Sequence, residues 1–257
     1  MPVPKPRSES MPARLMPPNG HGYLMLAATV DLRLPFLPNS RRKKELLTAL
    51  SEHLADVIRV PGVTQANLFD AQLVPPGMGR ELLRKRSVAP AQFDIVVLIE
   101  TVDPAGALAL RESAAYRDMK ARLTIDATRI YEVAARNSRR IADVDHGRDS
   151  VFFFNFFYAD DSGRLLTVWE DTAGWFVAKT ALADSTVLEP LPGEPDDYGI
   201  INHASWPHFR TFLPHLLLRP SFRRFVLATF ESNGIAAQPI LYHRVVPQRV
   251  AVQARAR

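Results

Sequence analysis

The stretch Val151–Tyr158 reads Val-Phe-Phe-Phe-Asn-Phe-Phe-Tyr, and seven of its eight residues are apolar or aromatic. Such side chains favour a strand, and turn-forming residues flank the stretch on both sides. We therefore predict a central strand that is buried on both faces. The exception, Asn155, needs a partner, because burying an unpaired amide costs about 1–3 kcal/mol. Either a backbone group or a water satisfies Asn155, or its side chain faces an internal cavity.

The composition is that of a globular protein with a core. The chain has 257 residues, enough for one large domain or two ordinary ones, and 47% of them are hydrophobic. No apolar run approaches the roughly 20 residues of a membrane helix, so we expect no integral membrane segment. The N-terminus has no apolar stretch typical of a signal peptide. There are no cysteines, which excludes disulfides and thiolate metal sites and is compatible with a cytoplasmic protein.

The net charge is +5, and much of it lies in short basic runs. Basic runs can bind nucleic acid or anionic lipid. Here they fall at element ends, in linkers and in the tail, without a nucleic-acid motif. We interpret them as solvated surface and expect no nucleic-acid partner. The runs are Arg41–Lys44, Arg84–Arg86, Arg139–Arg140 and the arginines of the C-terminal tail.

The predicted domain organisation has two repeats with flexible ends. Residues 1–20 hold six of the 21 prolines and can bury little apolar surface, so we expect disorder there. A polar, charged stretch that contains Gly147 is interpreted as a linker. The predicted parts are a disordered segment 1–21, repeat 1 at 22–136, a linker at 137–149, repeat 2 at 150–246 and a flexible basic tail at 247–257.

The two repeats show the same order of elements. Apolar periodicity, caps and breakers predict β-α-β-β-α-β twice. In repeat 1 these are strands 23–34, 63–74, 93–102 and 125–134, with a helix from residue 39 or 40 to about 58 and another from Asp103. In repeat 2 they are strands 151–158, 185–191, 198–205 and 238–246, a helix at 165–180, and a helical region 207–232 interrupted at Pro214 and Pro220.

A β-α-β-β-α-β unit is the ferredoxin-like split βαβ, which has helices on one face of its sheet. The other face must be buried if it is apolar. The predicted fold class is therefore α+β, with two tandem ferredoxin-like repeats that pack sheet to sheet.

This organisation resembles the dimeric α/β-barrel superfamily, in the form where duplication places both halves in one chain. The resemblance rests on the element order and on the related pieces Ser113–Arg117 and Ser221–Arg223. The superfamily includes cofactor-independent antibiotic-biosynthesis monooxygenases, isomerases and haem-binding groups, whose ligands lie inside the barrel or between sheet and helices. The resemblance alone does not choose among these activities.

Polar residues on neighbouring strands of repeat 2 suggest a site. A ferredoxin-like sheet places the last and third strands on either side of the first. One register would align Asn155 with His203 and with either His243 or Tyr242, whereas the matching strands of repeat 1 are mostly apolar. We therefore predict a catalytic site in repeat 2 alone, with His203 or His243 as a general base and Asn155 orienting the substrate. The alternative is that both histidines lie at strand ends in water.

Aromatic residues around this row suit a flat apolar or aromatic ligand, although each of them could equally be part of the core. The predicted substrate-binding residues are Tyr198, Trp206, Phe153, Tyr242 and Trp175.

Three functions remain open at this stage. The first is a small-molecule enzyme of the monooxygenase or isomerase type without a metal cofactor. The second is a haem protein with His215 or His208 as the axial ligand, since haem needs a single axial histidine. The third is a non-catalytic binding or assembly module that uses the basic ends. The protein would be a monomer or a homodimer.

Overall fold

The computed structural model describes residues 13–33 and 37–246. The helices are α1 (Arg41–Val57), α2 (Arg80–Lys85), α3 (Pro104–Leu110), α4 (Ala114–Asp126), α5 (Gly163–Thr180), α6 (Phe209–Leu218), the π-helical η1 (Phe222–Leu227) and α7 (Ala228–Ser232). The strands are β1 (Gly22–Thr29), β2 (Val63–Leu73), β3 (Ile95–Thr101), β4 (Arg129–Ala142), β5 (Val151–Ala159), β6 (Asp184–Pro190), β7 (Ile200–Trp206) and β8 (Ile235–Arg244).

The eight strands form one closed barrel in the order β1-β3-β2-β8-β5-β7-β6-β4. Each repeat contributes four neighbouring strands in the predicted ferredoxin-like order. Antiparallel pairs β2–β8 and β4–β6 join the two repeats, and we call these pairs the two seams. Closure pairs the edges that each four-stranded sheet would otherwise leave open. The predicted fold class is confirmed.

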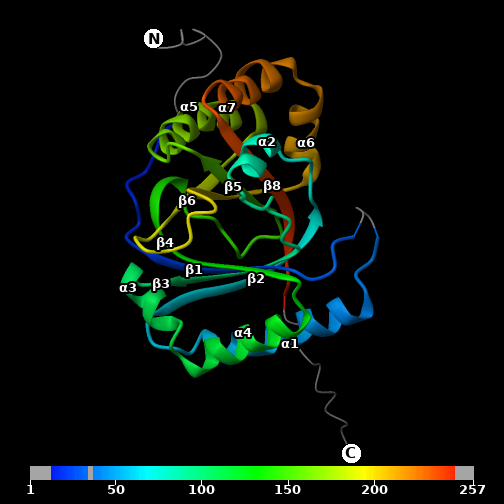
Figure 1. Ribbon diagram of the computed structural model, residues 1–257, viewed down its shortest axis with the longest axis vertical. Helices are drawn as coiled ribbons and strands as arrows, with labels where there is room; N and C mark the ends of the chain where they lie inside the picture. The colour runs from blue at the N-terminus through cyan, green and yellow to red at the C-terminus, as the bar shows by residue number, and fades with distance from the viewer. Residues whose placement is uncertain (1–12, 34–36, 247–257) are drawn as a thin grey trace, which may run out of the picture.

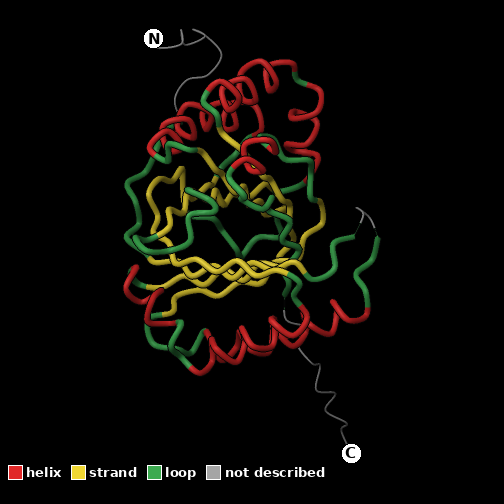
Figure 2. Tube along the Cα trace, in the orientation of Figure 1, coloured by secondary structure: helices red, strands yellow, loops and turns green. Residues whose placement is uncertain are grey.

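Helices cover the barrel on two opposite sides (Figures 1 and 2). Helices α1, α3 and α4 pack on the outer face of the repeat 1 sheet, and α5, α6, η1 and α7 cover repeat 2. In Figure 2 the yellow strands lie between two red helical layers. In the described residues, no helix is long and apolar enough to span a membrane.

The central strand β5 faces both layers, as predicted. Phe152, Phe154 and Phe156 point into the barrel and join its aromatic core, while Phe153 and Phe157 face the helices. All five are at most 9% exposed. A strand buried on both faces explains why this stretch is almost uninterrupted in its apolar character.

Several predicted boundaries in repeat 1 are wrong. The last strand does not start at residue 125, because α4 continues to Asp126, and it runs on to Ala142. Residues 137–142 therefore belong to the β4–β6 seam rather than to the predicted linker. Their polar side chains concealed a strand whose backbone pairs across the seam. The predicted single helix after Asp103 is two helices, α3 and α4, with Ser113 capping the second.

Two further predictions concern the N-terminus and the prolines. The predicted disorder is wrong over residues 13–21, because Met16 pairs with Arg140 of β4. The rest of that segment and the whole of the predicted C-terminal tail, 247–257, lie outside the described residues. Pro220 separates α6 from η1, as predicted, but Pro214 lies inside α6. Pro214 is exposed, and α6 continues through it without a backbone N–H donor at that position.

Candidate functional site

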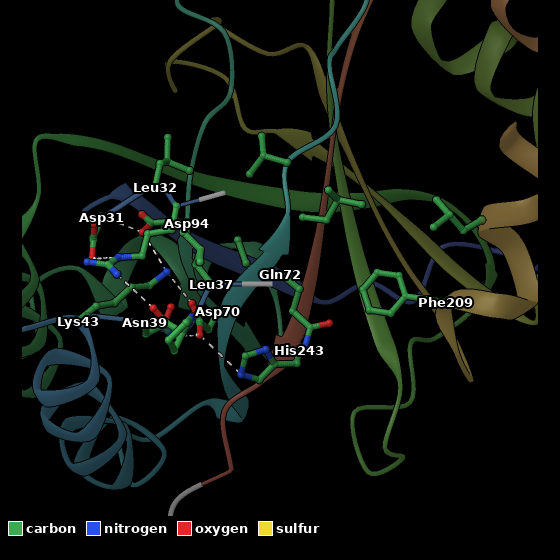
Figure 3. A pocket seen from close by; sticks show the side chains of 16 residues that line it. Asp31, Leu32, Leu37, Asn39, Lys43, Asp70, Gln72, Asp94, Phe209 and His243 are labelled. Atoms are coloured by element: carbon green, nitrogen blue, oxygen red, sulfur yellow. Dashed lines mark hydrogen bonds and ion pairs between the residues drawn. The ribbon is translucent and has the colours of Figure 1, made fainter. Parts of the chain in front are cut away.

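A cavity of about 620 Å³ lies beside the β2–β8 seam, with walls from both repeats. Repeat 1 supplies the connection between β1 and α1, the start of α1 and the end of β2. Repeat 2 supplies β8 and α6. In Figure 3 the polar residues gather at one end and Phe209 of α6 lies at the other. The apolar lining is Leu32, Leu37, Pro38, Ala71, Leu73, Val74, Phe209 and Leu213.

The polar end is organised around Lys43, which is 2% exposed. The N-cap residue Ser40 accepts a hydrogen bond from the Lys43 amide and so starts α1. The helix then directs the Lys43 side chain at the sheet, where its Nζ lies 2.6 Å from Asp70 and 3.0 Å from Asp94. The interpretation of Arg41–Lys44 as solvated surface is therefore wrong for Lys43, because this ammonium has two buried carboxylate partners.

The two carboxylates are held from several sides. Asp94 precedes β3 and accepts the backbone N–H groups of Val30 at 2.7 Å and Asp31 at 2.9 Å. Asp70 lies within β2 and accepts a hydrogen bond from the Asn39 side chain. Both carboxylates are 2% exposed. The Lys43–Asp70–Asp94 cluster therefore carries one negative charge in excess, and these hydrogen bonds fix its shape.

His243 of β8 lies directly opposite Asp70 across the seam. Its Nε2 is 3.6 Å from Asp70 Oδ2, and its side chain is 45% exposed. Its Nδ1 has no hydrogen-bond partner among the described residues. An imidazolium at this position would lie beside the excess negative charge of the cluster. The seam thus brings a histidine to a carboxylate at the polar end of an apolar cavity.

The predicted row of Asn155, His203 and His243 does not form. In the observed register Asn155 lies opposite Asn202 and Pro239, while His203 lies opposite Phe154. Because side chains alternate along a strand, Asn155 points to the helices and His203 points into the barrel. His243 faces outward at the β2–β8 seam.

His203 belongs to a second cavity, of about 140 Å³, at one end of the barrel interior. Its Nδ1 lies 3.2 Å from the Phe153 carbonyl oxygen, which can only accept, so Nδ1 carries the proton. Its Nε2 lies 2.9 Å from Nε2 of His146, and the ring centroids are 5.2 Å apart with planes at 14°. The rings therefore meet end to end. Burial lowers the pKa of His146 to about 4 and that of His203 well below its ordinary value, with His146 adding to the latter.

Asn155 faces a third space, of about 30 Å³, between the repeat 2 sheet and α5. It is 7% exposed, and its Oδ1 has no hydrogen-bond partner among the described residues. The neighbouring Asn202 accepts hydrogen bonds from the Trp169 indole at 3.0 Å and the Ser185 hydroxyl at 2.7 Å. This volume suits a bound water, which would pair the Asn155 amide.

The predicted substrate-binding aromatics lie in several places. Tyr198 and Tyr242 point into the barrel, where their hydroxyls donate to the Ala89 and Phe93 carbonyl oxygens, each at 2.7 Å. Phe153 and Trp206 line the 30 Å³ space, and Trp175 donates to Ser221 Oγ at 3.2 Å beneath η1. None of the five lines the 620 Å³ cavity.

The two histidines of the haem alternative lie on α6. His208 is the exposed N-cap residue, and His215 Nδ1 accepts a hydrogen bond from Arg219 Nε at 2.6 Å. Neither lines the 620 Å³ or the 140 Å³ cavity, and the 30 Å³ space under the repeat 2 helices is too small for a macrocycle. The residues around His208 and His215 therefore do not fit a haem. Within residues 13–33 and 37–246, no three His, Asp or Glu side chains gather to hold a metal ion.

Sequence reasoning missed Lys43, Asp70 and Asp94, although the signals were present. Lys43 lies three, four and seven residues before Leu46, Leu47 and Leu50, on the apolar stripe of α1. Asp70 follows the buried Leu68 and Phe69 within β2, and Asp94 directly precedes the apolar start of β3. A charge on an apolar face of a helix and two carboxylates in buried strands together indicate a buried ion cluster.

No protein-family model matches the chain, and no curated protein matches it in sequence. Many solved structures are similar in fold, and three of them illustrate the likeness. An anthrone oxidase-like protein is 11% identical with a TM-score of 0.62, over 93% of this chain and 95% of that one. A putative monooxygenase from Fusobacterium nucleatum is 8% identical with a TM-score of 0.56, over 88% and 93%.

The third structure, a putative monooxygenase from Lactobacillus acidophilus, is 8% identical with a TM-score of 0.50, over 88% of this chain and 94% of that one. These identities show the fold alone. The coverage extends over both repeats and therefore over the whole barrel. The chain has the dimeric α/β-barrel fold, with both of its ferredoxin-like halves in a single polypeptide.

Proposed function

We propose that the chain is a small-molecule enzyme that removes a proton from an apolar or aromatic substrate in the 620 Å³ cavity. His243 is the general base, and Asp70 orients it. The observation that carries this proposal is the His243–Asp70 pair at the polar end of a cavity whose other walls are apolar. Proton abstraction is the step that monooxygenase and isomerase chemistry without a metal cofactor share.

The roles of the two imidazole nitrogens follow from their partners. With Nε2–H directed at Asp70, the neutral ring keeps its lone pair on Nδ1, which is free of protein partners in the described structure. Nδ1 is covered in this conformation, so proton abstraction requires the half-exposed ring to turn toward the ligand. Hydrogen bonds of catalytic groups often tighten only in the complex, so the 3.6 Å separation from Asp70 is compatible with this role.

Other residues support the proton transfer without accepting or donating the proton. Lys43 and Asn39 hold Asp70 in place, and Asp70 stabilises the imidazolium that forms. The cavity volume lies within the range of roughly 300–1,000 Å³ that is typical of small-molecule sites. Its apolar wall, from Leu73 to Phe209, suits a ligand of two or three fused rings.

Anthrone is a suitable test substrate, because it is an uncharged three-ring molecule with an acidic CH₂ group. The name of the anthrone oxidase-like neighbour supports this choice. Deprotonation gives a carbanion that dioxygen can oxidise: the CH₂ carbon becomes a carbonyl, one oxygen atom enters the product anthraquinone, and the other leaves as water. Exchange of the CH₂ protons in D₂O reports the proton transfer by itself, whatever happens next.

The test compares wild type with His243→Gln in two measurements. Exchange of the anthrone CH₂ protons is followed by NMR under argon, and oxygen uptake is measured separately. General-base catalysis contributes about 10²–10⁴-fold, so we expect His243→Gln to lower the exchange rate by that factor. His208→Gln changes an exposed histidine outside the cavity and should match wild type. Unchanged exchange in His243→Gln would contradict the proposal.

The haem alternative and the non-catalytic module remain predictions. Addition of haem to the purified protein, followed by an absorption spectrum, tests the first; a Soret band that disappears in His215→Ala or His208→Ala would support it. Recovery of a partner that depends on residues 1–12 and 247–257 would support the second.

A further inference from the structure

The charges that line the 620 Å³ cavity do not balance. Three carboxylates and two cations line it, together with His243. With a neutral imidazole the lining therefore carries one negative charge in excess. The carboxylates are Asp31, Asp70 and Asp94, and the cations are Arg33 and Lys43.

Both cations already have anionic partners. Lys43 lies between Asp70 and Asp94, with all three side chains 2–3% exposed. Arg33 Nε donates to Asp31 Oδ2 at 2.9 Å, and its Nη1 donates to the Pro38 carbonyl oxygen at 3.3 Å. Among the described lining residues, no cation is left to pair with a negatively charged ligand. An organic anion that entered would meet an uncompensated carboxylate in a largely apolar space.

Among the described lining residues, His243 contributes the imidazole, the kind of side chain that can be neutral or carry one positive charge. It faces Asp70 on β2, with Lys43 of α1 behind that carboxylate. Asp94 is the second carboxylate partner of Lys43, and Asp31, which pairs with Arg33, lies at the same polar end of the cavity (Figure 3). The next residue, Arg244, lies opposite the inward-facing Phe69 and therefore on the other face of the sheet. One proton on His243 brings the charge of the lining to zero.

We propose that the cavity admits an organic anion only together with a proton on His243, and that its substrates enter as uncharged weak acids. This inference rests on the proposed function of the same site. The substrate class is a multi-ring ketone or phenol without a carboxylate. Transfer of its proton to His243 leaves the total charge of the site unchanged, because the imidazolium and the substrate anion form together.

Two probes with the same ring system separate charge from shape: 9-anthracenemethanol, which is neutral, and 9-anthracenecarboxylate. Their affinities are measured by calorimetry between pH 6 and 8.5, in two buffers of different ionisation enthalpy. We expect the alcohol to bind independently of pH. The carboxylate should weaken by up to tenfold per pH unit as pH rises, and at the alkaline end each bound carboxylate should take up about one proton.

Variants assign these effects to residues. His243→Gln should bind the alcohol within twofold of wild type but the carboxylate at least tenfold more weakly at pH 6, without proton uptake. Phe209→Ala should weaken both probes by a similar factor, which places them in this cavity. His208→Gln should behave as wild type.

The outcomes distinguish the two proposals. A carboxylate that binds at pH 8 as tightly as the alcohol, or without proton uptake, overturns the charge inference. If anthrone exchange still needs His243 in that case, the general-base role stands. Proton-linked binding that depends on His243, together with unchanged exchange in His243→Gln, overturns the general-base role alone. Failure of both probes to bind wild type would overturn the charge inference, and anthrone exchange would then decide the general-base role by itself.

Discussion

The outer faces of the two repeats differ in what polar residues do beneath the helices. In repeat 1 the ions Lys43, Asp70 and Asp94 lie beside an open cavity of about 620 Å³. In repeat 2 a neutral network around Asn202 lies beside a space of about 30 Å³. Buried ions need fixed partners, whereas amides, hydroxyls and indoles can be satisfied while aromatic helices pack closely over them. A polar residue in a buried strand is thus not by itself the sign of a site.

We expect the largest effect from separating the two repeats. Residues 150–246 expressed alone would expose the inward aromatics of β5 and the unpaired edges of β6 and β8. We expect this fragment to aggregate or to form a homodimer, as judged by light scattering and near-UV dichroism, whereas cleavage near Gly147 should leave the halves associated. A well-folded monomeric fragment would show that the repeats are independent domains.

Removal of Lys43 should have the next largest effect. Lys43→Met leaves Asp70 and Asp94 buried without their cation, and breaking a buried pair in this way costs about 3–5 kcal/mol. Lys44→Met alters the exposed neighbour on the same helix and should change the free energy of unfolding by less than about 0.5 kcal/mol. Urea unfolding followed by tryptophan fluorescence measures both. Equal stability of the two variants would show that the cluster contributes little.

The partly buried His146 is a third kind of polar residue, one whose surroundings favour the neutral side chain. Burial lowers the pKa of His146 to about 4 from an ordinary 6.5. As pH falls through 6.5, the unfolded chain takes up this proton first, so stability is full above that pH and declines toward pH 4. The loss is about 3 kcal/mol for this group. His146→Gln should show a shallower decline between pH 7 and 4.5 in urea titrations; a slope equal to that of wild type and of His208→Gln would exclude this role.

The smallest expected effects concern two amide side chains of repeat 2, those of Asn202 and Asn155. Asn202→Val leaves the Trp169 indole and the Ser185 hydroxyl without their acceptor and should cost about 1–3 kcal/mol. Asn155→Val removes an amide whose Oδ1 lacks a protein partner in the described structure, and we expect a change within about 1 kcal/mol of wild type. Thermal unfolding of the pair tests this order, and the reverse order would indicate that Asn155 is satisfied in a way that Asn202 is not.

The order of elements and the strand order within each repeat could be predicted, because apolar periodicity and caps act over a few residues. Asp103 was predicted as a helix cap, and Asn39 or Ser40 as the cap of the first helix, where the structure shows Ser40. The limits of β4 could not be predicted, since its polar end is held by pairing with β6 rather than by its own composition.

The site was harder to predict for the same reason. His243 was selected as a candidate base, but its partner Asp70 comes from the other repeat and meets it only through barrel closure. The predicted alignment of Asn155 with His203 required a register that differs by one residue from the observed one. A shift of one residue moves a side chain to the opposite face of the sheet. The partner of His243 and the strand register both depend on contacts between distant parts of the chain, so no local sequence pattern predicts them.

The two seams have a consequence for stoichiometry. In a symmetric dimer of identical repeats both seams would be the same, and every cavity would occur twice. In this chain one seam places His243 opposite Asp70, whereas the other places Arg136 opposite Glu189. Because both halves lie in one chain, each seam has its own residues. Ligand titrations should therefore saturate at one equivalent per barrel, with a simple hyperbolic isotherm.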